Sequence, residues 1–183
     1  MFFSVITVTY NSRSYLKQTI DSILAQRFTD FELIIGDDCS LDDSWEIILK
    51  YADPRIRRYR NDTTLGEYAN RTKALQQATG KYLIFIDGDD LMYEHALSTL
   101  ARYIEFFPEC AMYFSREWDP RILCPFKVDP LTIYRFEYLD GGIMGGNFTK
   151  VLFKTEILKD YSFPEGIRSG DSYIQLKIAQ QHP

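Results

Sequence analysis

Two patterns of apolar residues alternate along the first hundred positions of this chain. Three runs, residues 2–10, 31–36 and 82–86, are rich in apolar β-branched and aromatic residues, a composition typical of strands. A further short strand is predicted at residues 56–59. After each run, apolar residues recur every three or four positions, which predicts helices. These repeats cover residues 16–24, 45–49, 66–78 and 94–107.

The regular alternation of strands and helices predicts an α/β fold with a doubly wound, mostly parallel sheet and right-handed crossovers. The 82–86 run holds five apolar or aromatic residues in succession, so we expect helices to cover both faces of the sheet. In the 66–78 helix, the spacing predicts that Ala69, Leu75 and Ala78 face inward.

The second half of the chain is less regular. Apolar runs predict strands at 110–114 and 151–153, and a last helix follows Asp171. The stretch 118–140 contains three prolines, and we expect it to form a long loop over the sheet. Because the last helix stops almost where the sequence stops, the chain could be a fragment of a longer protein.

Polar side chains end three of the predicted strands. Thr9 and Tyr10 close the first strand, Asp37-Asp38 the second and Asp87-Gly88-Asp89 the fourth. The carboxyl ends of parallel strands form one edge, and ligands of open α/β sheets bind at that edge. Polar turns also end strands, so an ordinary turn is the alternative at Asp37 and at the Asp-Gly-Asp sequence.

The acids after the fourth strand have the spacing of a cation site. Asp87 and Asp89 are two positions apart and point the same way, so both could face one hard divalent ion such as Mn²⁺ or Mg²⁺. Gly88 removes a side chain where a ligand would need to approach the backbone closely.

The other strand ends suit a nucleotide. The ring of Tyr10 could stack on a base, and the carboxylate of Asp38 could accept hydrogen bonds from a base N–H or a ribose hydroxyl. The sequence has no glycine-rich phosphate loop, so the charge of a diphosphate would have to be met by the metal ion and by side chains such as Arg71. For Arg71, a surface ion pair is the alternative.

Composition narrows the class of protein. With 183 residues the chain has the length of one domain, and its net charge of −5 argues against a nucleic-acid-binding surface. No stretch has the length of a membrane span, and no signal peptide is visible. The three cysteines lack metal-ligand spacing, which indicates free thiols in a reducing compartment. We expect a cytoplasmic protein, at the inner face of the membrane if parts outside this chain attach it there.

Several segments resemble the catalytic domain of glycosyltransferase family 2, which has the GT-A fold, a Rossmann-like sheet. They occur in the family's order and spacing across roughly the first hundred residues. These segments are residues 4–11 (SVITVTYN), 26–40 (QRFTDFELIIGDDCS), 66–71 (GEYANR), 78–82 (ATGKY) and 85–90 (FIDGDD).

The resemblance implies that the chain transfers a sugar from a nucleotide-diphosphate sugar, most often a UDP-sugar, to a glycan, lipid-linked or polymer acceptor. Transfer in the family usually inverts the anomeric carbon and uses Mg²⁺ or Mn²⁺. The implied domain covers 1–183, with a nucleotide-sugar-binding half at 1–107 and an irregular acceptor-side half at 108–183.

The resemblance also implies roles for single residues. It places Tyr10 against the nucleotide base, Asp38 on the base or ribose, Arg71 near the donor, Asp87 near the ribose or sugar, and Asp89 on the metal. Thr9 and Gly88 lie inside the same segments, and we assign both to the nucleotide-sugar site.

The catalytic base is implied by a match in the second half. The family carries an acidic residue there, often Glu-Asp, in a loop just before a helix. In this chain the place is taken by Gly170-Asp171, which implies that Asp171 is the base. Gly170 replaces the first acid, and the alternative for Asp171 is an N-terminal helix cap.

Three other functions remain open from the sequence. The chain could be a nucleotide-sugar-binding module that has lost activity, because Gly170 stands where the family has an acid. A receiver-type signalling domain also gathers acids at strand ends, but its paired acids follow the first strand. A haloacid-dehalogenase-type phosphatase uses Asp-x-Asp near its first strand, whereas here the motif ends the fourth.

Overall fold

The computed structural model describes residues 1–114, 127–130, 132–133, 149, 151–163 and 170–183. Within these residues six strands form one sheet in the order β3-β2-β1-β4-β6-β5. The strands are β1 (Phe3–Thr9), β2 (Phe31–Asp37), β3 (Ile56–Arg60), β4 (Tyr82–Phe85), β5 (Met112–Phe114) and β6 (Val151–Lys154). The helices are α1 (Leu16–Leu24), α2 (Ser44–Leu49), α3 (Glu67–Gln77), α4 (Ala96–Phe106), α6 (Thr155–Lys159) and α7 (Gly170–Ala179).

The first four strands are parallel, and β6 runs antiparallel to both of its neighbours. The predicted α/β fold with a mostly parallel sheet is therefore confirmed. The chain passes from β1 to β2 on one side and places β4 on the other side of β1. The strand order thus reverses at β1, which is where open α/β sheets bind ligands.

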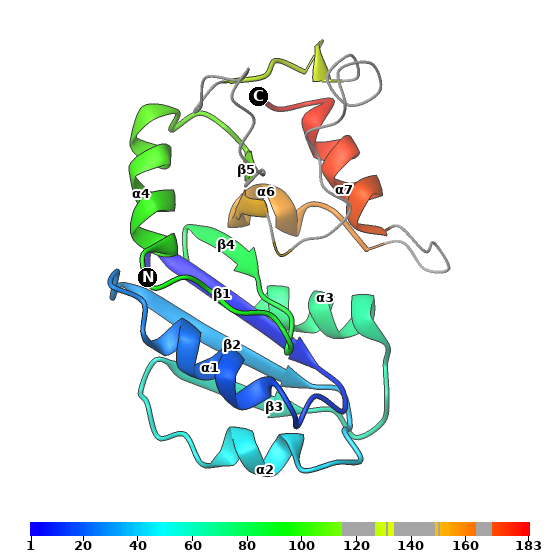
Figure 1. The fold of residues 1–183 in the computed structure, drawn as a ribbon. Coiled ribbons are helices and arrows are strands. Elements are labelled where there is room, and N and C mark those ends of the chain that lie inside the picture. Colours follow the sequence, from blue (N-terminus) through cyan, green and yellow to red (C-terminus); the bar gives the residue numbers. More distant parts are fainter. Residues whose placement is uncertain (115–126, 131, 134–148, 150, 164–169) are drawn as a thin grey trace.

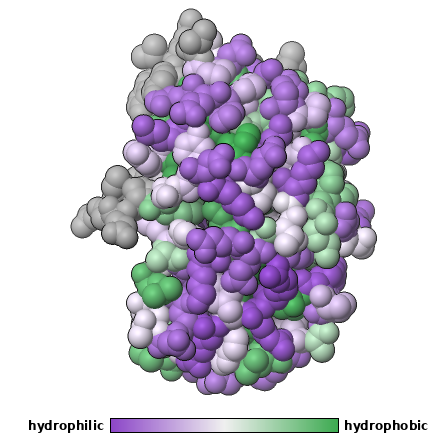
Figure 2. All heavy atoms as spheres, turned by 180° about the vertical axis from the view of Figure 1, so that it is seen from behind, coloured by the Kyte–Doolittle hydropathy of each residue, from purple (hydrophilic) through white to green (hydrophobic). Residues whose placement is uncertain are grey.

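Helices cover both faces of the sheet, as the apolar runs predict. Val5 and Leu33 point into one core with α1, α2 and α4, whereas Ile6 and Ile34 point into a second core with α3, α6 and α7. All four strand residues are fully buried. Figure 1 shows α1 and α2 on the near side of the sheet and α3 behind it. Figure 2 shows the opposite face of the molecule, where hydrophilic side chains predominate and apolar ones form only small groups.

A few local predictions are wrong or fall outside the described residues. Ala69 is exposed, while Leu75 and Ala78 are buried as expected. The short helix α6 was not predicted, because five residues leave too little room for a helical repeat to show. Most of the predicted loop at 118–140 lies outside the described residues.

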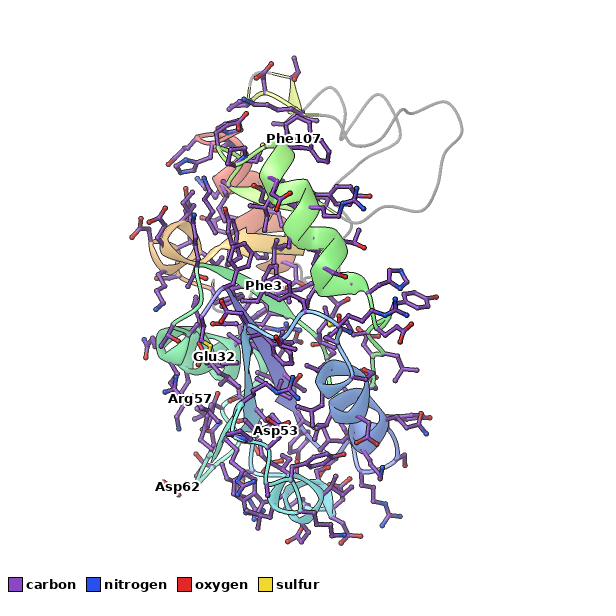
Figure 3. All side chains as sticks on the ribbon, turned by 90° about the vertical axis from the view of Figure 1, so that its left-hand side faces the viewer. Phe3, Glu32, Asp53, Arg57, Asp62 and Phe107 are labelled. Carbon is purple, nitrogen blue, oxygen red and sulfur yellow. The ribbon has the colours of Figure 1, made fainter. Side chains whose placement is uncertain are left out.

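One carboxylate near the amino ends of the strands is enclosed by donors. Glu32 opens β2 with a side chain that is 4% exposed, and it accepts hydrogen bonds from Ser4 Oγ (2.7 Å), Thr79 N (2.7 Å) and Arg57 Nη1 (3.1 Å). Figure 3 labels Glu32 and Arg57, which lie close together on this part of the sheet. Burial alone would raise the pKa of Glu32, but these hydrogen bonds outweigh it and hold the pKa below its usual range.

Two further expectations concern thiols and membranes. Cys39 and Cys110 are free thiols, as predicted, and Cys124 lies outside the described residues. Within the described residues, no helix combines the length and the apolar character needed to cross a bilayer.

Candidate active site

The loops after β1 and β2 are joined at the carboxyl edge of the sheet. Asp38 N donates to Thr9 O (2.9 Å), and Asn11 N donates to Ser40 Oγ (3.0 Å). Asn11 has a positive φ of 55°, which turns the chain sharply after the strand. The Tyr10 side chain is left 47% exposed at this edge, where its ring is available for stacking.

Asp38 anchors the segment that leads into α3. Its carboxylate accepts hydrogen bonds from Asn61 Nδ2 (2.8 Å), Leu65 N (2.9 Å) and Gly66 N (2.8 Å). These contacts use three of the roughly four acceptor positions of the carboxylate, and Asp38 is 4% exposed. The role of Asp38 on a base or ribose stays a prediction, and its observed contacts hold the start of α3 against the strand end.

Asp37 is a turn residue, which was the alternative left open for it. Its side chain is fully buried and lies 3.3 Å from Arg60 Nε, and it accepts a hydrogen bond from Ser40 N (3.1 Å). It therefore closes the turn after β2 and faces away from solvent.

Thr9 and Gly88 pack against each other. A Cβ atom on Gly88 would lie 2.9 Å from Thr9 Oγ1, so only glycine fits without movement of the neighbouring strand. The structure adds a packing reason for Gly88 to the predicted one, which was close approach of a ligand. The Thr9 hydroxyl is buried and has no hydrogen-bond partner among the described residues. Contact of either residue with a donor stays a prediction.

Arg71 is a buried cation shared by two carboxylates. Its Nη2 atom lies 2.6 Å from Asp87 Oδ1 and 2.9 Å from Glu67 Oε1. The guanidinium also lies over the ring of Phe85, 5.0 Å from its centroid. The Arg71 side chain is 2% exposed, so the alternative of a surface ion pair is wrong. The sequence analysis did not assign Glu67 to the site. It stands four residues before Arg71 on α3.

Asp87 is the acid of this group whose ionised form is disfavoured by its surroundings. Burial raises the pKa of its carboxyl; Arg71 opposes the rise, while the charges of Glu67 and Asp90 add to it. Arg71 thus does not fully offset the burial of Asp87 and the charges of Glu67, on α3, and Asp90, after β4. A further cation at this edge would relieve their repulsion.

The described residues contain no group of three or more His, Cys, Asp or Glu side chains placed to hold a metal ion. Mg²⁺ and ions of similar preference, however, are commonly held by one or two carboxylates together with substrate phosphates, not by an all-protein cage. Asp89 is exposed beside Asp87, which is already paired with Arg71. This donor set fits an ion that binds together with a diphosphate, and the roles of Asp87 and Asp89 as its ligands stay a prediction.

Asp171 lies in the first turn of α7 and is only 7% exposed. The hydroxyl of Tyr68 reaches this turn from α3, where it accepts a hydrogen bond from Gly170 N at 3.0 Å. The pKa of Tyr68 is raised, first by burial and then by the charge of Asp171 and a hydrogen bond to that carboxylate. Sequence reasoning missed Tyr68, although it stands inside the matched segment 66–71.

The start of α3 therefore connects all the acids assigned to the site except Asp89. Gly66 N contacts Asp38, Tyr68 contacts the turn of Asp171, and Arg71 contacts Asp87. The sequence separation of these acids, from 38 to 171, is large, and one helix brings them into a common framework.

A cavity of about 610 Å³ lies beside this edge, under α4. Its walls are mainly apolar and come from β4, β5, β6, α4 and the last residues of the chain, with Asp90 and His95 among the polar members. It opens on the side of the sheet opposite α3.

Comparison with known proteins gives consistent matches. Residues 4–161 match the profile of the family described as "Glycosyl transferase family 2". The chain is 36% identical over 190 residues to the GalNAc(5)-diNAcBac-PP-undecaprenol beta-1,3-glucosyltransferase of Campylobacter jejuni, covering 97% of this chain and 60% of that protein.

Solved structures give the same fold. Staphylococcus aureus TarS residues 1–349, in complex with UDP, superposes with a TM-score of 0.80 at 27% identity, covering 98% of this chain and 55% of TarS 1–349. The mannosyltransferase PcManGT of Pyrobaculum calidifontis, in complex with GDP-Man and Mn²⁺, gives a TM-score of 0.76 over 96% of this chain and 51% of that one. Its identity of 20% shows a common fold alone.

The chain spans about half the length of several relatives that it matches. It covers 47% of a glucosyltransferase of Escherichia coli and 44% of a teichuronic acid biosynthesis glycosyltransferase of Bacillus subtilis.

Proposed function

Because the chain belongs to glycosyl transferase family 2 and has its GT-A fold, we propose that it transfers a sugar from a nucleotide-diphosphate sugar to a hydroxyl of a glycan, lipid-linked or polymer acceptor. The donor in this proposal is a UDP-sugar. The observation that carries the proposal is the convergence of Asp38, Asp87 and Asp171 on the start of α3 at the ligand-binding edge of the sheet.

The donor side of the proposal rests on exposure and charge. Tyr10 offers an exposed ring for the base, and the remaining acceptor position of Asp38 suits a base N–H or a ribose hydroxyl. The Asp87 side chain is 33% exposed, and its pKa is raised. It is thus held in place by its surroundings and still accessible to a sugar hydroxyl of the donor. TarS has been solved with UDP and with UDP-GlcNAc, which supports the UDP class of donor.

Asp89 and Asp87 would hold a divalent cation, Mn²⁺ or Mg²⁺. When bound, such an ion would stabilise negative charge on the leaving diphosphate. Arg71 keeps Asp87 oriented throughout, because its guanidinium is already fixed between Asp87 and Glu67.

Asp171 is proposed to take the proton from the acceptor hydroxyl as that oxygen attacks the anomeric carbon. A single base acting on the face opposite the leaving diphosphate gives inversion, and no second carboxylate is needed as a nucleophile. The departure at Gly170 does not argue against activity, since a Cβ atom there would lie 2.7 Å from the Tyr68 ring. The glycine is thus matched to the tyrosine of α3, and loss of the acid has a packing reason.

Transfer of radiolabel from UDP-glucose and UDP-GlcNAc, to water and to candidate acceptors, tests the proposal in the presence of Mn²⁺. We expect Asp171→Asn to lower turnover by about 10²- to 10⁴-fold while UDP binding, measured by calorimetry, is unchanged. Turnover at the parent rate in Asp171→Asn would refute the base assignment. UDP binding with no turnover on any donor, in the parent chain, would instead indicate the inactive binding module.

A further inference from the structure

Tyr68 is built into the turn that carries Asp171. Its hydroxyl oxygen accepts the Gly170 N–H at 3.0 Å, and its ring occupies the space that a Cβ atom on Gly170 would need. The Asp171 carboxylate lies close enough that its charge, together with a hydrogen bond, raises the pKa of the same hydroxyl. A phenol can accept one hydrogen bond and donate another. Because the oxygen accepts the Gly170 N–H, a hydrogen bond between this hydroxyl and the Asp171 carboxylate is donated by the O–H.

The ring of Tyr68 is itself held in place. It stacks on Phe163, with centroids 5.8 Å apart and an interplanar angle of 17°. Its backbone belongs to α3, three residues before Arg71, so the hydroxyl and the guanidinium stand one turn apart on a single helix. A rigid helix thereby sets the position of one group at Asp87 and of another at Asp171.

We propose that Tyr68 is a positioning residue for the carboxylate of Asp171, holding it in the orientation from which it accepts the proton of the acceptor hydroxyl. This inference rests on the proposed function and adds to it a residue that the sequence motifs do not assign. It also accounts for the pairing of Tyr68 with Gly170: a larger residue at 170 would push the ring, and with it the hydroxyl, away from the base.

A merely structural tyrosine would behave differently. If the ring alone mattered, removal of the hydroxyl would leave the Phe163 stack and the fit to Gly170 intact and would not alter turnover. If the hydroxyl positions Asp171, its removal must act through Asp171 and must leave donor binding at Asp38 and Asp87 unaffected.

The test is Tyr68→Phe, with Tyr51→Phe as the matched control. The Tyr51 hydroxyl also donates to an aspartate, Asp21 Oδ1 at 2.7 Å, but on the surface between α1 and the end of α2. We expect Tyr68→Phe to lower kcat about tenfold to a hundredfold with an unchanged KM for the donor, as loss of a hydrogen bond to a charged group predicts. Tyr51→Phe should keep the parent kcat.

A double-mutant cycle tells whether the effect passes through the base. In the Asp171→Asn background, Tyr68→Phe should cause no further loss, because the group it positions no longer accepts a proton. An unchanged kcat in Tyr68→Phe, or an equal loss in both backgrounds, would overturn the inference and leave the proposed function standing. A parent rate in Asp171→Asn would instead overturn the proposed function.

A measurement that needs no turnover covers the case in which transfer is too slow to follow. In protein with ¹³C-labelled aspartate carboxyls, the Asp171 signal is identified by its loss in Asp171→Asn. The hydrogen bond from Tyr68 favours the ionised carboxylate, so Tyr68→Phe should move the Asp171 titration to higher pH. Glu67 is the other acid of α3 whose charge reaches Tyr68, and it is retained in both proteins. A titration that does not move would contradict the inference.

Discussion

Two carboxylates on this sheet lie beside an arginine, and their pKa values are shifted in opposite directions. Near the amino ends of the strands, Glu32 accepts hydrogen bonds from three residues and its pKa is lowered. At the carboxyl ends, burial and two neighbouring acids outweigh Arg71, and the pKa of Asp87 is raised. The first acid is fully compensated within the protein. The second keeps uncompensated negative charge at the carboxyl edge of the sheet, which would favour a cation there.

The largest effect on stability should come from Arg71, the cation paired with Asp87 at the carboxyl ends of the strands. Arg71→Ala would leave Asp87 without its cation and remove a buried side chain, at a loss of about 3 kcal/mol in the free energy of unfolding. Urea unfolding measures this loss. Arg27→Ala is the control, because the Arg27–Glu94 pair is exposed and its removal should change stability by less than about 0.5 kcal/mol. Equal losses in the free energy of unfolding for the two substitutions would show that Arg71 does not compensate Asp87.

A carboxylate-to-amide change at Glu32, near the amino ends of the strands, should also destabilise the protein. Glu32→Gln keeps the shape but replaces one acceptor oxygen by a donor. That donor faces either Ser4 and Thr79, at the Oε1 position, or Arg57, at the Oε2 position. We expect a loss of about 2 kcal/mol in the free energy of unfolding. Turnover per folded molecule should not change, because Glu32 lies at the opposite edge from the proposed site.

The same carboxylate-to-amide change at Asp87, at the carboxyl ends of the strands, should hardly alter stability. Asp87→Asn removes a charge whose ionisation is disfavoured in the folded protein, so the free energy of unfolding should stay within about 1 kcal/mol of the parent value or rise. Donor binding should fall sharply. A destabilisation as large as that of Glu32→Gln would show that Asp87 is a structural acid, and the contrast between the two ends would be lost.

The pH dependence of stability should be divided between the two acids. The folded pKa of Glu32 is lowered, so its contribution is present above its ordinary value of 4.5 and is lost as the pH falls. The folded pKa of Asp87 is raised, so its contribution is present below its ordinary value of 3.8 and is lost as the pH rises. Glu32→Gln should therefore lose less stability than the parent between about pH 5 and pH 3 in urea titrations. An identical acid profile would contradict the assignment.

The sequence predicts the parallel half of the fold well because strands and helices there alternate with strong apolar periodicity. The edge that collects Tyr10, Asp38 and Asp87 follows from the parallel direction of the strands alone. What could not be predicted depends on contacts between distant segments: the fit of Gly88 on Thr9 shows only when two strand ends are side by side.

Tyr68 is the clearest omission from the sequence analysis. On α3 it resembles any half-buried aromatic residue, and its partner Gly170 lies about a hundred residues away. The match of a tyrosine hydroxyl to a glycine N–H has no signature in periodicity or composition. Arg71 was found, but its burial between two acids was not, because an arginine on a helix is usually exposed.

We propose that the acids at the carboxyl edge bind a nucleotide diphosphate and that those at the amino edge do not. Calorimetric titration of UDP in the presence of Mn²⁺ tests it directly on the parent chain, Asp87→Asn and Glu32→Gln. The account predicts equal affinity in the parent chain and Glu32→Gln, and at least a tenfold weaker affinity, about 1.4 kcal/mol, in Asp87→Asn. Binding to Asp87→Asn as tight as to the parent chain, or no binding to any of the three, would contradict it.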